Sequence, residues 1–457
     1  MLSAAVTDLV IIGSGPAGMA AACEARALDL SVVLLDEQAT LGGQIYRSIE
    51  SASANLLQVL GQDYASGRSL ASDFRNSGTR YLGGAVVWNV SSDGTVDYVA
   101  NGRSDRVIGK HVLLASGAME RPFPISGWTL PGVMGAGAAQ ILLKGSGALP
   151  TGPVVLAGCG PLLYLLAWQY LRAGATIRAV VDTTTLSDYV RAARHMTGAI
   201  RGWRDLVKGV KLLTALHHPG VRVFSGCSEL SIEGEGRVEA LSFKHRGRPV
   251  RVPASLLLLH QGVIPNTQLS WSIGAAHRWD PDQLCWQPVT DSWGRLGASP
   301  IYVAGDSRAI VGARASAVQG RLAALAIGER LGVVTDFARR AAPLERELRR
   351  HTYIRPFLDA LYRPKNENRI PPSDSVVVCR CEEVTAGEIR QCVELGCQGP
   401  NQTKAFSRCG MGPCQGRFCG LTVTEIIAQA RGVEPSDVGY YRIRPPIKPV
   451  MLGDFLQ

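Results

Sequence analysis

Four cysteines late in the chain have the residue type and the spacing of a metal or cluster site. Cys379 and Cys381 form a Cys-x-Cys pair in "VVVCRCEEVTAGEI", and Cys414 and Cys419 flank "QGRF" after a gap of 32 residues. A Cys-x-Cys at the end of a strand places two thiolates side by side for one iron, and the later loop returns a second pair. Four thiolates in two pairs suit a [2Fe–2S] cluster. The same four sulfurs also suit Zn²⁺, and a disulfide is a further alternative.

The residues around these cysteines supply a helix start and hydrogen-bond donors. "TAGEI" predicts a helix with Thr385 as its N-cap and Glu388 three residues later, which is the capping-box pattern. The glycines in "GMGPCQG" (410–416) leave backbone N–H groups near the sulfurs, and hydrogen bonds to ligand sulfurs tune the potential of a cluster. The sequence therefore predicts a small separate domain that starts near Val376.

A glycine-rich turn near the start of the chain has the pattern of a dinucleotide site. "DLVIIGSGPAGMAAACEARALDLSVVLLDE" (8–37) predicts strand, turn, helix and strand. Gly13 makes the turn, Gly15 lets a pyrophosphate approach, and Gly18 lets the helix pack on the strand. Asp36 follows Gly18 by 18 residues, where a carboxylate accepts from ribose hydroxyls. The predicted cofactor-binding residues of this segment are Gly13, Gly15, Pro16, Ala17, Gly18, Asp36 and Glu37.

Three later segments favour FAD over NAD as the ligand of this turn. They are "LGGQIYR" (41–47), "HVLLASGAMERP" (111–122) and "IYVAGDSRAIVGARASAVQGRLAALAIGERL" (301–331). In the third, Gly305-Asp306 places a carboxylate for a flavin ribityl hydroxyl, and the helix that follows points its N-terminus at the pyrophosphate. Over residues 8–332 the pattern resembles the flavoprotein family that includes the pyridine nucleotide–disulfide oxidoreductases. The further predicted FAD-binding residues are Gly43, Gln44, Val87, Ala115, Gly117, Gly305 and Asp306.

A second strand–turn–helix–strand unit interrupts the first. "GPVVLAGCGPLLYLLAWQYLRAGATIRAVVDT" (152–183) carries Gly158 and Gly160, but Leu163 occupies the third glycine position. In the resembling family this domain holds the nicotinamide cofactor. A bulky leucine crowds the helix–strand contact, so we expect no bound NAD(P) and a fold kept for structure or docking.

A thiol reductase is excluded by the other cysteines. Such enzymes carry a close redox pair beside the flavin, whereas Cys23, Cys159, Cys227 and Cys285 are isolated in the sequence. An isolated cysteine most often packs as a small buried hydrophobe.

The cysteine segment resembles the bacterioferritin-associated-ferredoxin-like [2Fe–2S] domain, through "CRCEEVTAGEI" and "KAFSRCGMGPCQGRFCG". The resemblance implies that the cluster ligands are Cys379, Cys381, Cys414 and Cys419. Cys409 falls where many relatives carry alanine and is therefore not expected to be a ligand, although an exchange with Cys419 stays open. Cys392 and Cys397 lie on the intervening helix and turn and are expected to be structural.

The whole chain resembles the larger flavin subunits of bacterial opine oxidases and D-hydroxyproline dehydrogenases, and it is similar to the middle subunit of hydrogen cyanide synthase. "GWTLPGVMGAGAAQILLK" (127–144), "LLLLHQGVIPNTQL" (256–269) and "NQTKAFSRCGMGPCQGR" (401–417) carry this resemblance. It implies a hetero-oligomer. A D-amino-acid-oxidase-like flavoprotein subunit would oxidise the substrate C–N bond, a small ferredoxin-like subunit would join, and FMN would lie at a subunit interface.

These observations predict an α/β chain with two Rossmann-like dinucleotide-binding domains and a small α-rich [2Fe–2S] domain. The FAD domain, glutathione-reductase-like, comprises 1–150 and 290–333 and contains the second domain, 151–289. A basic linker (334–375), the cluster domain (376–440) and a tail (441–457) follow. Another basic stretch, 190–213, is predicted as one amphipathic surface helix.

Composition limits the classes of partner and location. The net charge is +10, but the Lys and Arg residues are scattered without a nucleic-acid-binding motif, so no nucleic acid partner is expected. The first residues run into a strand without a secretory signal. The most apolar helix, "PLLYLLAWQYL", is too short to cross a bilayer. We therefore expect a cytoplasmic protein that is not an integral membrane protein.

A chain with a flavin and an iron–sulfur cluster converts two-electron into one-electron transfer. No catalytic base stands beside the flavin motifs. His260 follows four leucines and either faces the flavin or ends a core strand. We therefore predict an oxidoreductase subunit that relays electrons from C–N oxidation on a partner. The alternatives are a hydrogen cyanide synthase subunit, an NAD(P)H-dependent ferredoxin-type reductase, and a scaffold whose nucleotide site holds ATP or nothing.

Overall fold

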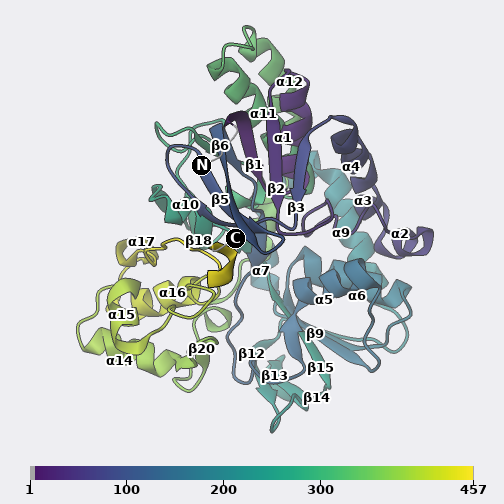
Figure 1. The fold of residues 1–457 in the computed structure, drawn as a ribbon. Helices are drawn as coiled ribbons and strands as arrows, with labels where there is room; N and C mark the ends of the chain where they lie inside the picture. Colours follow the sequence, from purple (N-terminus) through teal and green to yellow (C-terminus); the bar gives the residue numbers. More distant parts are fainter. Residues whose placement is uncertain (1–5, 456–457) are drawn as a thin grey trace. The chain divides into compact units, whose positions relative to one another are not determined.

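The computed structural model describes residues 6–455 (Figure 1), and the chain divides into two compact units. The first unit contains the described residues up to Met119, Ile264–Thr352 and the residues from Arg442 onward. The second contains Glu120–Val263 and Tyr353–Tyr441. The predicted fold class is confirmed, with two α/β regions and a helical region that contains the late cysteines.

The first unit is built on a seven-stranded sheet. Along its main path the order is β3 (Arg80–Gly83), β2 (Val32–Asp36), β1 (Val6–Ile12), β6 (Arg103–Leu114), β5 (Thr95–Ala100) and β4 (Val86–Val90). The strand β19 (Ile301–Val303) pairs in parallel with the end of β6. β1, β2 and β3 also run parallel, and the buried Val, Ile and Leu side chains of β1 and β2 are typical of strands covered on both faces.

Two helices made largely of small residues pack on each other in this unit, α1 (Pro16–Arg26) and α11 (Ala313–Arg330). A Cβ atom on Gly320 would lie 2.1 Å from the carbonyl oxygen of Ala17, so only glycine permits this approach. The remaining elements of the unit are α2 (Ala54–Leu60), α3 (Gln62–Ala65), α4 (Gly67–Asn76), α10 (Gln268–Ser272), β17 (His277–Asp280), β18 (Cys285–Pro288), η1 (Gly305–Ser307), α12 (Phe337–Thr352) and η3 (Leu452–Phe455).

The second unit contains a five-stranded sheet in the order β11 (Arg222–Ser225), β10 (Ile177–Asp182), β9 (Val154–Cys159), β15 (Leu256–Gln261) and β8 (Val133–Gly135). An antiparallel sheet of β12 (Ser228–Glu233), β13 (Ala240–His245) and β14 (Arg248–Pro253) shares its apolar core. Its helices include α5 (Ala136–Ser146), α6 (Pro161–Arg172) and α13 (Arg355–Leu361). The short strands β7 (Ala118–Glu120) and β16 (Val263–Pro265) complete the α/β part of the chain.

The stretch 190–213 is not one helix, so that prediction is wrong. The structure has α7 (Leu186–Ala193), α8 (Met196–Arg201) and α9 (Trp203–Ala215), separated at Arg194-His195 and at Gly202. Gly202 lies between α8 and α9, and its missing side chain lets the chain approach Ile354, whose Cβ would be 3.0 Å from a Cβ on this residue. The buried residues of α7 and α8 pack against α13, and this tertiary contact overrides the helical periodicity.

The late cysteines belong to a small helical region of the second unit. It consists of β20 (Val377–Cys379), β21 (Val384–Thr385), α14 (Ala386–Glu394), α15 (Pro400–Ser407), α16 (Gly420–Arg431) and α17 (Pro435–Val438). The predicted capping box at Thr385 and Glu388 is confirmed. The Trp128 indole N–H donates to the Val377 carbonyl over 2.7 Å, which ties β20 to the α/β part of the same unit.

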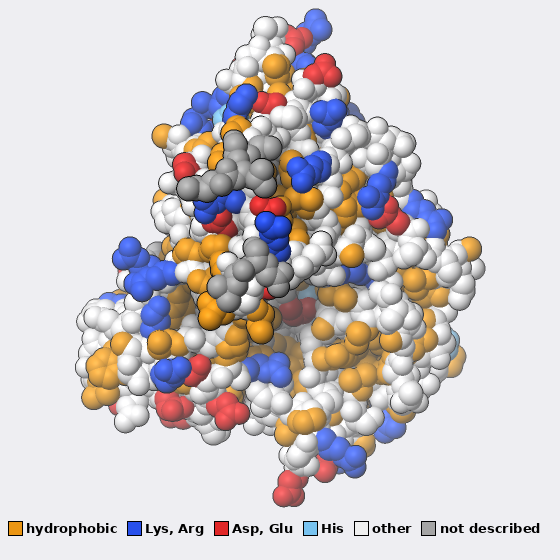
Figure 2. Space-filling model, in the orientation of Figure 1, with side chains coloured by type: hydrophobic (Ala, Val, Ile, Leu, Met, Phe, Trp, Pro, Cys, Tyr) orange, Lys and Arg blue, Asp and Glu red, His pale blue; other side chains and the backbone are white. Residues whose placement is uncertain are grey.

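Basic side chains do not gather into one patch on the face drawn in Figure 2, where Lys and Arg are dispersed among apolar and polar groups. Within residues 6–455 no helix has both the length and the apolar character needed to cross a membrane.

Candidate functional site

The first glycine turn is closely packed everywhere except at its central glycine. A Cβ on Gly13, whose φ is +109°, would lie 2.4 Å from the Ala115 carbonyl oxygen, and one on Gly18 would lie 1.9 Å from that of Gly13. A Cβ on Gly15 would meet no described atom within 4 Å. The open space therefore lies at the N-terminus of α1, where free backbone N–H groups and the helix dipole favour a phosphate.

Asp36 ends β2 and holds the turn in place. Its carboxylate accepts from the Ser14 backbone N–H at 2.6 Å and hydroxyl at 2.8 Å, and from the Gln38 N–H at 2.7 Å. The side chain is buried at the ribose position that the sequence predicts. Glu37 is exposed and ion-paired with Lys448 of the tail. Sequence reasoning missed this tail contact, because no local pattern relates residues that are so far apart in the chain.

The other predicted FAD-binding segments converge on the same turn. A Cβ on Gly43 would lie 2.9 Å from the Gly15 Cα, and one on Gly305 would lie 2.9 Å from the Ala17 Cβ. Asp306 accepts at Oδ1 from the backbone N–H groups of residues 311 and 312, at 2.8 and 2.9 Å. Among residues 6–455 its Oδ2 has no hydrogen-bond partner. The remaining oxygen is therefore able to accept from a ribityl hydroxyl, and the residues present fit FAD.

Three other predicted FAD contacts lie in the same unit. Val87 is buried in β4, Gly117 has a φ of +70°, and Gln44 is exposed with its carbonyl accepting from Arg47 at 3.0 Å.

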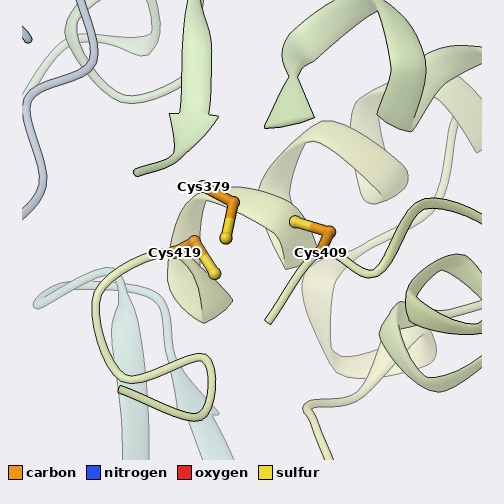
Figure 3. A group of neighbouring side chains, drawn as sticks. All are labelled: Cys379, Cys409 and Cys419. Atoms are coloured by element: carbon orange, nitrogen blue, oxygen red, sulfur yellow. The ribbon is translucent and has the colours of Figure 1, made fainter. Parts of the chain in front are cut away.

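Three of the late cysteines form one buried group. The sulfurs of Cys379, Cys409 and Cys419 all lie within 4.8 Å of one another, and Figure 3 shows the three side chains pointing toward one another. Cys379 ends β20, Cys419 caps α16, and Cys409 lies in the loop after α15. Hydrogen bonds from the Cys409 and Cys419 thiols, and from the Gly410 backbone N–H, hold the pKa of Cys379 far below its usual range. This arrangement stabilises a thiolate, the form that binds metals.

The two remaining predicted ligands form a second pair nearer the surface. The Cys381 and Cys414 thiols are hydrogen-bonded to each other, Cys381 is exposed and Cys414 is half-buried. A Cβ on Gly412 would lie 2.3 Å from the Cys381 Cβ, so this glycine lets the loop close over the Cys-x-Cys. The structure thus groups Cys379 with Cys419 and Cys409, and Cys381 with Cys414. Among the four predicted ligands, each group takes one sulfur from the Cys-x-Cys and one from the loop, instead of pairing within each motif.

Two tyrosines that sequence reasoning missed hold the cysteine loop. The Tyr441 hydroxyl donates to the Cys409 carbonyl over 2.8 Å, and its buried ring covers Gly410 and Gly416. The Tyr440 ring lies against Gly420. The signal in the sequence was the glycines of the loop, which leave room for rings. Cys392 and Cys397 lie apart from this group as a further buried, hydrogen-bonded pair.

The second glycine turn is more filled than the first. Leu163 is fully buried, the Tyr164 hydroxyl donates to the Asp182 carboxylate over 2.8 Å, and the Thr184 N–H donates to the other oxygen over 2.8 Å. Burial raises the pKa of Asp182. The Cys159 thiol of this turn donates to the Tyr362 carbonyl over 3.7 Å. The carboxylate at the end of this unit is thus held by protein hydrogen bonds, as Asp36 is in the first turn, and what distinguishes the second turn is the buried Leu163 at the third glycine position.

His260 belongs to the core strand β15 and is buried. Its Nδ1 is hydrogen-bonded to the carboxylate of Glu120, and that carboxylate also accepts from the Gly137 N–H over 2.8 Å. The imidazole thus lies at the second glycine turn, where its ring is 3.5 Å from the Cβ position of Gly160.

Comparison with known proteins agrees with this architecture. Residues 7–328 match the family described as pyridine nucleotide-disulphide oxidoreductase, and residues 374–455 match the sarcosine oxidase A3 domain. The chain is 47% identical over 460 residues to the A subunit of opine oxidase from Rhizobium meliloti, covering 98% of this chain and 87% of that protein.

Two more distant similarities extend over the same length. Hydrogen cyanide synthase subunit HcnB of Pseudomonas protegens is 30% identical over 461 residues, covering 98% of this chain and 97% of that one. The solved structure of L-proline dehydrogenase from P. horikoshii covers 98% of this chain and 79% of that chain, with a TM-score of 0.73 and 21% identity. The last similarity concerns the fold alone.

Proposed function

Since the chain belongs to the pyridine nucleotide-disulphide oxidoreductase family and groups with opine oxidase A subunits, we propose that it relays electrons within a multisubunit amine dehydrogenase of the opine or D-amino acid type. The coarser statement, that it is a subunit of a flavin-dependent oxidoreductase, follows directly from that family and those relatives. The observation that carries the finer proposal is the presence of a flavin-type turn and a four-thiol set in one chain.

In this proposal the first unit holds FAD. The N-terminus of α1 and the open space at Gly15 receive the pyrophosphate, and Asp36 receives the ribose. Asp306 orients the ribityl chain through Oδ2, which has no hydrogen-bond partner among residues 6–455. Bound FAD takes up two electrons together as a hydride equivalent, whereas a [2Fe–2S] cluster carries one electron at a time. Backbone N–H and carboxylate groups around the turn thus position a two-electron acceptor in one unit.

The thiols of the second unit are the proposed cluster ligands. Cys379 and Cys419 would hold one iron, and Cys381 and Cys414 the other, because [2Fe–2S] clusters take two thiolates per iron. The first pair is buried and the second reaches the surface. One end of the site is therefore open to an external electron carrier. Zn²⁺ remains the competing occupant, since four sulfurs suit both.

The second dinucleotide-like domain is proposed to act without NAD(P). Leu163 is fully buried at the third glycine position. The His260 ring lies 3.5 Å from the Cβ position of Gly160, whereas a Cβ on Gly15 of the first turn meets no described atom within 4 Å. The second turn therefore leaves less room for a pyrophosphate. A stand-alone NAD(P)H-dependent reductase would need that site, so bleaching of the flavin by NADH in the isolated protein would contradict this part of the proposal.

A partner subunit is supported by the relatives, which are named as subunits of opine oxidase and of hydrogen cyanide synthase. We propose as partner a D-amino-acid-oxidase-like flavoprotein; a small ferredoxin-like subunit with FMN at an interface would complete the complex. The helices α7–α9 offer a docking face. Its exposed large apolar side chains are Leu186, Tyr189, Val190, Met196, Ile200, Trp203, Val207 and Val210.

Charge identifies the kind of surface that fits this face. Around the apolar side chains, α8 and α9 expose the cations Arg201, Arg204, Lys208 and Lys211 against the single exposed anion of these two helices, Asp205. A large exposed apolar patch marks an interaction site, and cations at its rim favour an acidic partner. The proposed occupant is therefore an acidic, apolar face of the substrate-oxidising flavoprotein. Binding of the isolated chain to anionic vesicles instead would contradict that assignment.

The cluster proposal is tested on protein purified without oxygen. The expected result is bound FAD, about two irons per chain, and a paramagnetic spectrum in the reduced sample. Cys414→Ser should lose that spectrum while FAD absorbance remains, because the two sites use different residues. Zinc in place of iron, or a reduced sample without a spectrum, would refute the proposal.

Substrate class is tested by co-expression with a D-amino-acid-oxidase-like subunit. Dye reduction with opines or D-amino acids is expected only for the complex. Turnover of glycine with release of cyanide would favour the alternative that the HcnB similarity supports. Activity of this chain alone on an opine would contradict the relay.

A further inference from the structure

The buried thiol group contains one sulfur more than the proposed ligand set uses. Cys379 and Cys419 belong to that set, and Cys409 joins them with no exposed surface and its sulfur within 4.8 Å of both (Figure 3). We propose that Cys409 is a positioning residue that donates its S–H hydrogen bond to the cluster's ligand sulfurs and thereby raises the reduction potential of the cluster. This inference rests on the cluster of the proposed function.

The positions of the sulfurs support a donor role. The Cys409 sulfur lies within 4.8 Å of the Cys379 and Cys419 sulfurs, and the three side chains point toward one another (Figure 3). When Cys419 binds iron it carries no proton, so Cys409 is the one thiol of this group that still has a proton to donate. A hydrogen bond to a charged acceptor is stronger than one to a neutral acceptor. Reduction adds negative charge to the cluster and its sulfurs, so such a bond stabilises the reduced form and raises the potential.

The backbone of Cys409 is held in a position from which its thiol can donate to the sulfur of Cys379 or of Cys419. Its carbonyl accepts from the Tyr441 hydroxyl at 2.8 Å, and its N–H donates to the Ser407 hydroxyl at 3.3 Å. The next residue, Gly410, has a φ of +86° and lies under the Tyr441 ring, whose nearest atom would be 2.5 Å from a Cβ there. These contacts anchor the backbone on both sides of the thiol. The side chain itself has no exposed surface, so the thiol lies inside the protein beside the two ligand sulfurs.

Sulfur pairing argues against Cys409 as a fifth ligand. A [2Fe–2S] cluster needs four thiolates. Cys381 and Cys414 lie outside the buried group and supply two of these thiolates. The other iron therefore needs only two of the three buried sulfurs. Cys409 could bind iron only in place of Cys419 or Cys379.

The test compares the anaerobically purified wild type with Cys409→Ala and Cys409→Ser. Iron content, the reduced paramagnetic spectrum and the midpoint potential are measured for each. Cys409→Ala should keep its iron and become harder to reduce by about tenfold in the reduction equilibrium, which is about 59 mV for a one-electron couple. Cys409→Ser keeps a hydroxyl donor, so its midpoint potential should stay nearer that of the wild type. This variant also provides the measurement if Cys409→Ala does not fold.

A buried thiol of the same region provides the control. Cys397→Ala removes a sulfur that is paired with Cys392 outside the group, and it should leave the potential unchanged. A wild-type potential in Cys409→Ala would overturn the inference. So would loss of iron from Cys409→Ala together with retention of iron in Cys419→Ala, since Cys409 would then be the ligand. Zinc or no cluster in the wild type would instead refute the proposed function itself.

Discussion

Replacing Gly15 with alanine separates the role of the glycine turn in folding from its role in cofactor binding. Gly15 is the N-cap of α1 with φ −72° and ψ −176°, a conformation open to any residue. A Cβ there would meet no described atom within 4 Å. The free energy of unfolding of the apoprotein should therefore stay the same or rise by about 0.4–1 kcal/mol, because alanine restricts the unfolded chain.

The affinity for FAD should change in the opposite direction. The added methyl group fills the space that we assign to the pyrophosphate at the N-terminus of α1. Loss of one hydrogen bond to a charged phosphate costs about 1.5–3 kcal/mol. The dissociation constant of FAD should therefore rise roughly 10- to 150-fold.

The assay titrates the apoprotein with FAD by flavin fluorescence and measures thermal unfolding with and without FAD. Gly145→Ala is the matched control, because Gly145 lies in α5 and a Cβ there also meets nothing within 4 Å. It should leave FAD binding unchanged. An unaltered FAD affinity in Gly15→Ala would show that the open space is not the pyrophosphate site. A strongly destabilised apoprotein would refute the geometry of the turn.

Three further predictions concern the second unit. Burial raises the pKa of Asp182 in the folded protein, so its stabilising contribution is complete below the unfolded value of about 3.9 and is lost as the pH rises through the folded value. The melting temperature of Asp182→Asn, relative to that of the wild type, should therefore rise as the pH increases above about 4; a difference that does not change with pH would contradict this. Arg369 and Glu425 form a buried ion pair, so Arg369→Met should lower the free energy of unfolding in urea by about 3–5 kcal/mol, and adding Glu425→Leu should restore most of it. If the double variant is as unstable as Arg369→Met, the unpaired charge of Glu425 is not the cause of the lost stability. Trp203 is 58% exposed, so Trp203→Glu should weaken capture by the flavoprotein partner, with less than about 0.5 kcal/mol change in folding stability; undiminished capture would remove α9 from the docking face.

Local patterns in the sequence were enough for each turn and helix start that depends on neighbouring residues. The spacing of Gly13, Gly15 and Gly18 predicts a tight strand–helix turn because backbone dihedrals and the absence of a Cβ act within a few residues. The structure has the turn, with close contacts at Gly13 and Gly18. The capping box at Thr385 and Glu388 is local in the same sense and is confirmed.

Which side chains meet across long separations was decided only by the tertiary structure. Spacing along the chain identified four thiols but not how they group, and the family resemblance set Cys409 aside as a non-ligand. The folded loop brings Cys409 beside Cys379 and Cys419. The ion pair of Glu37 with Lys448, and the hydroxyl of Tyr164 on Asp182, likewise join segments without a shared local pattern.

The chain by itself therefore determined the kinds of site: a flavin-type turn and a thiol set. The fold determined their composition. Local sites arise from dihedral preferences and hydrogen bonds within a single turn, and these depend on residues that are neighbours in the sequence. Pairings between distant residues depend on how rings, glycines and buried charges pack, and a side chain's partner is set by that packing as a whole.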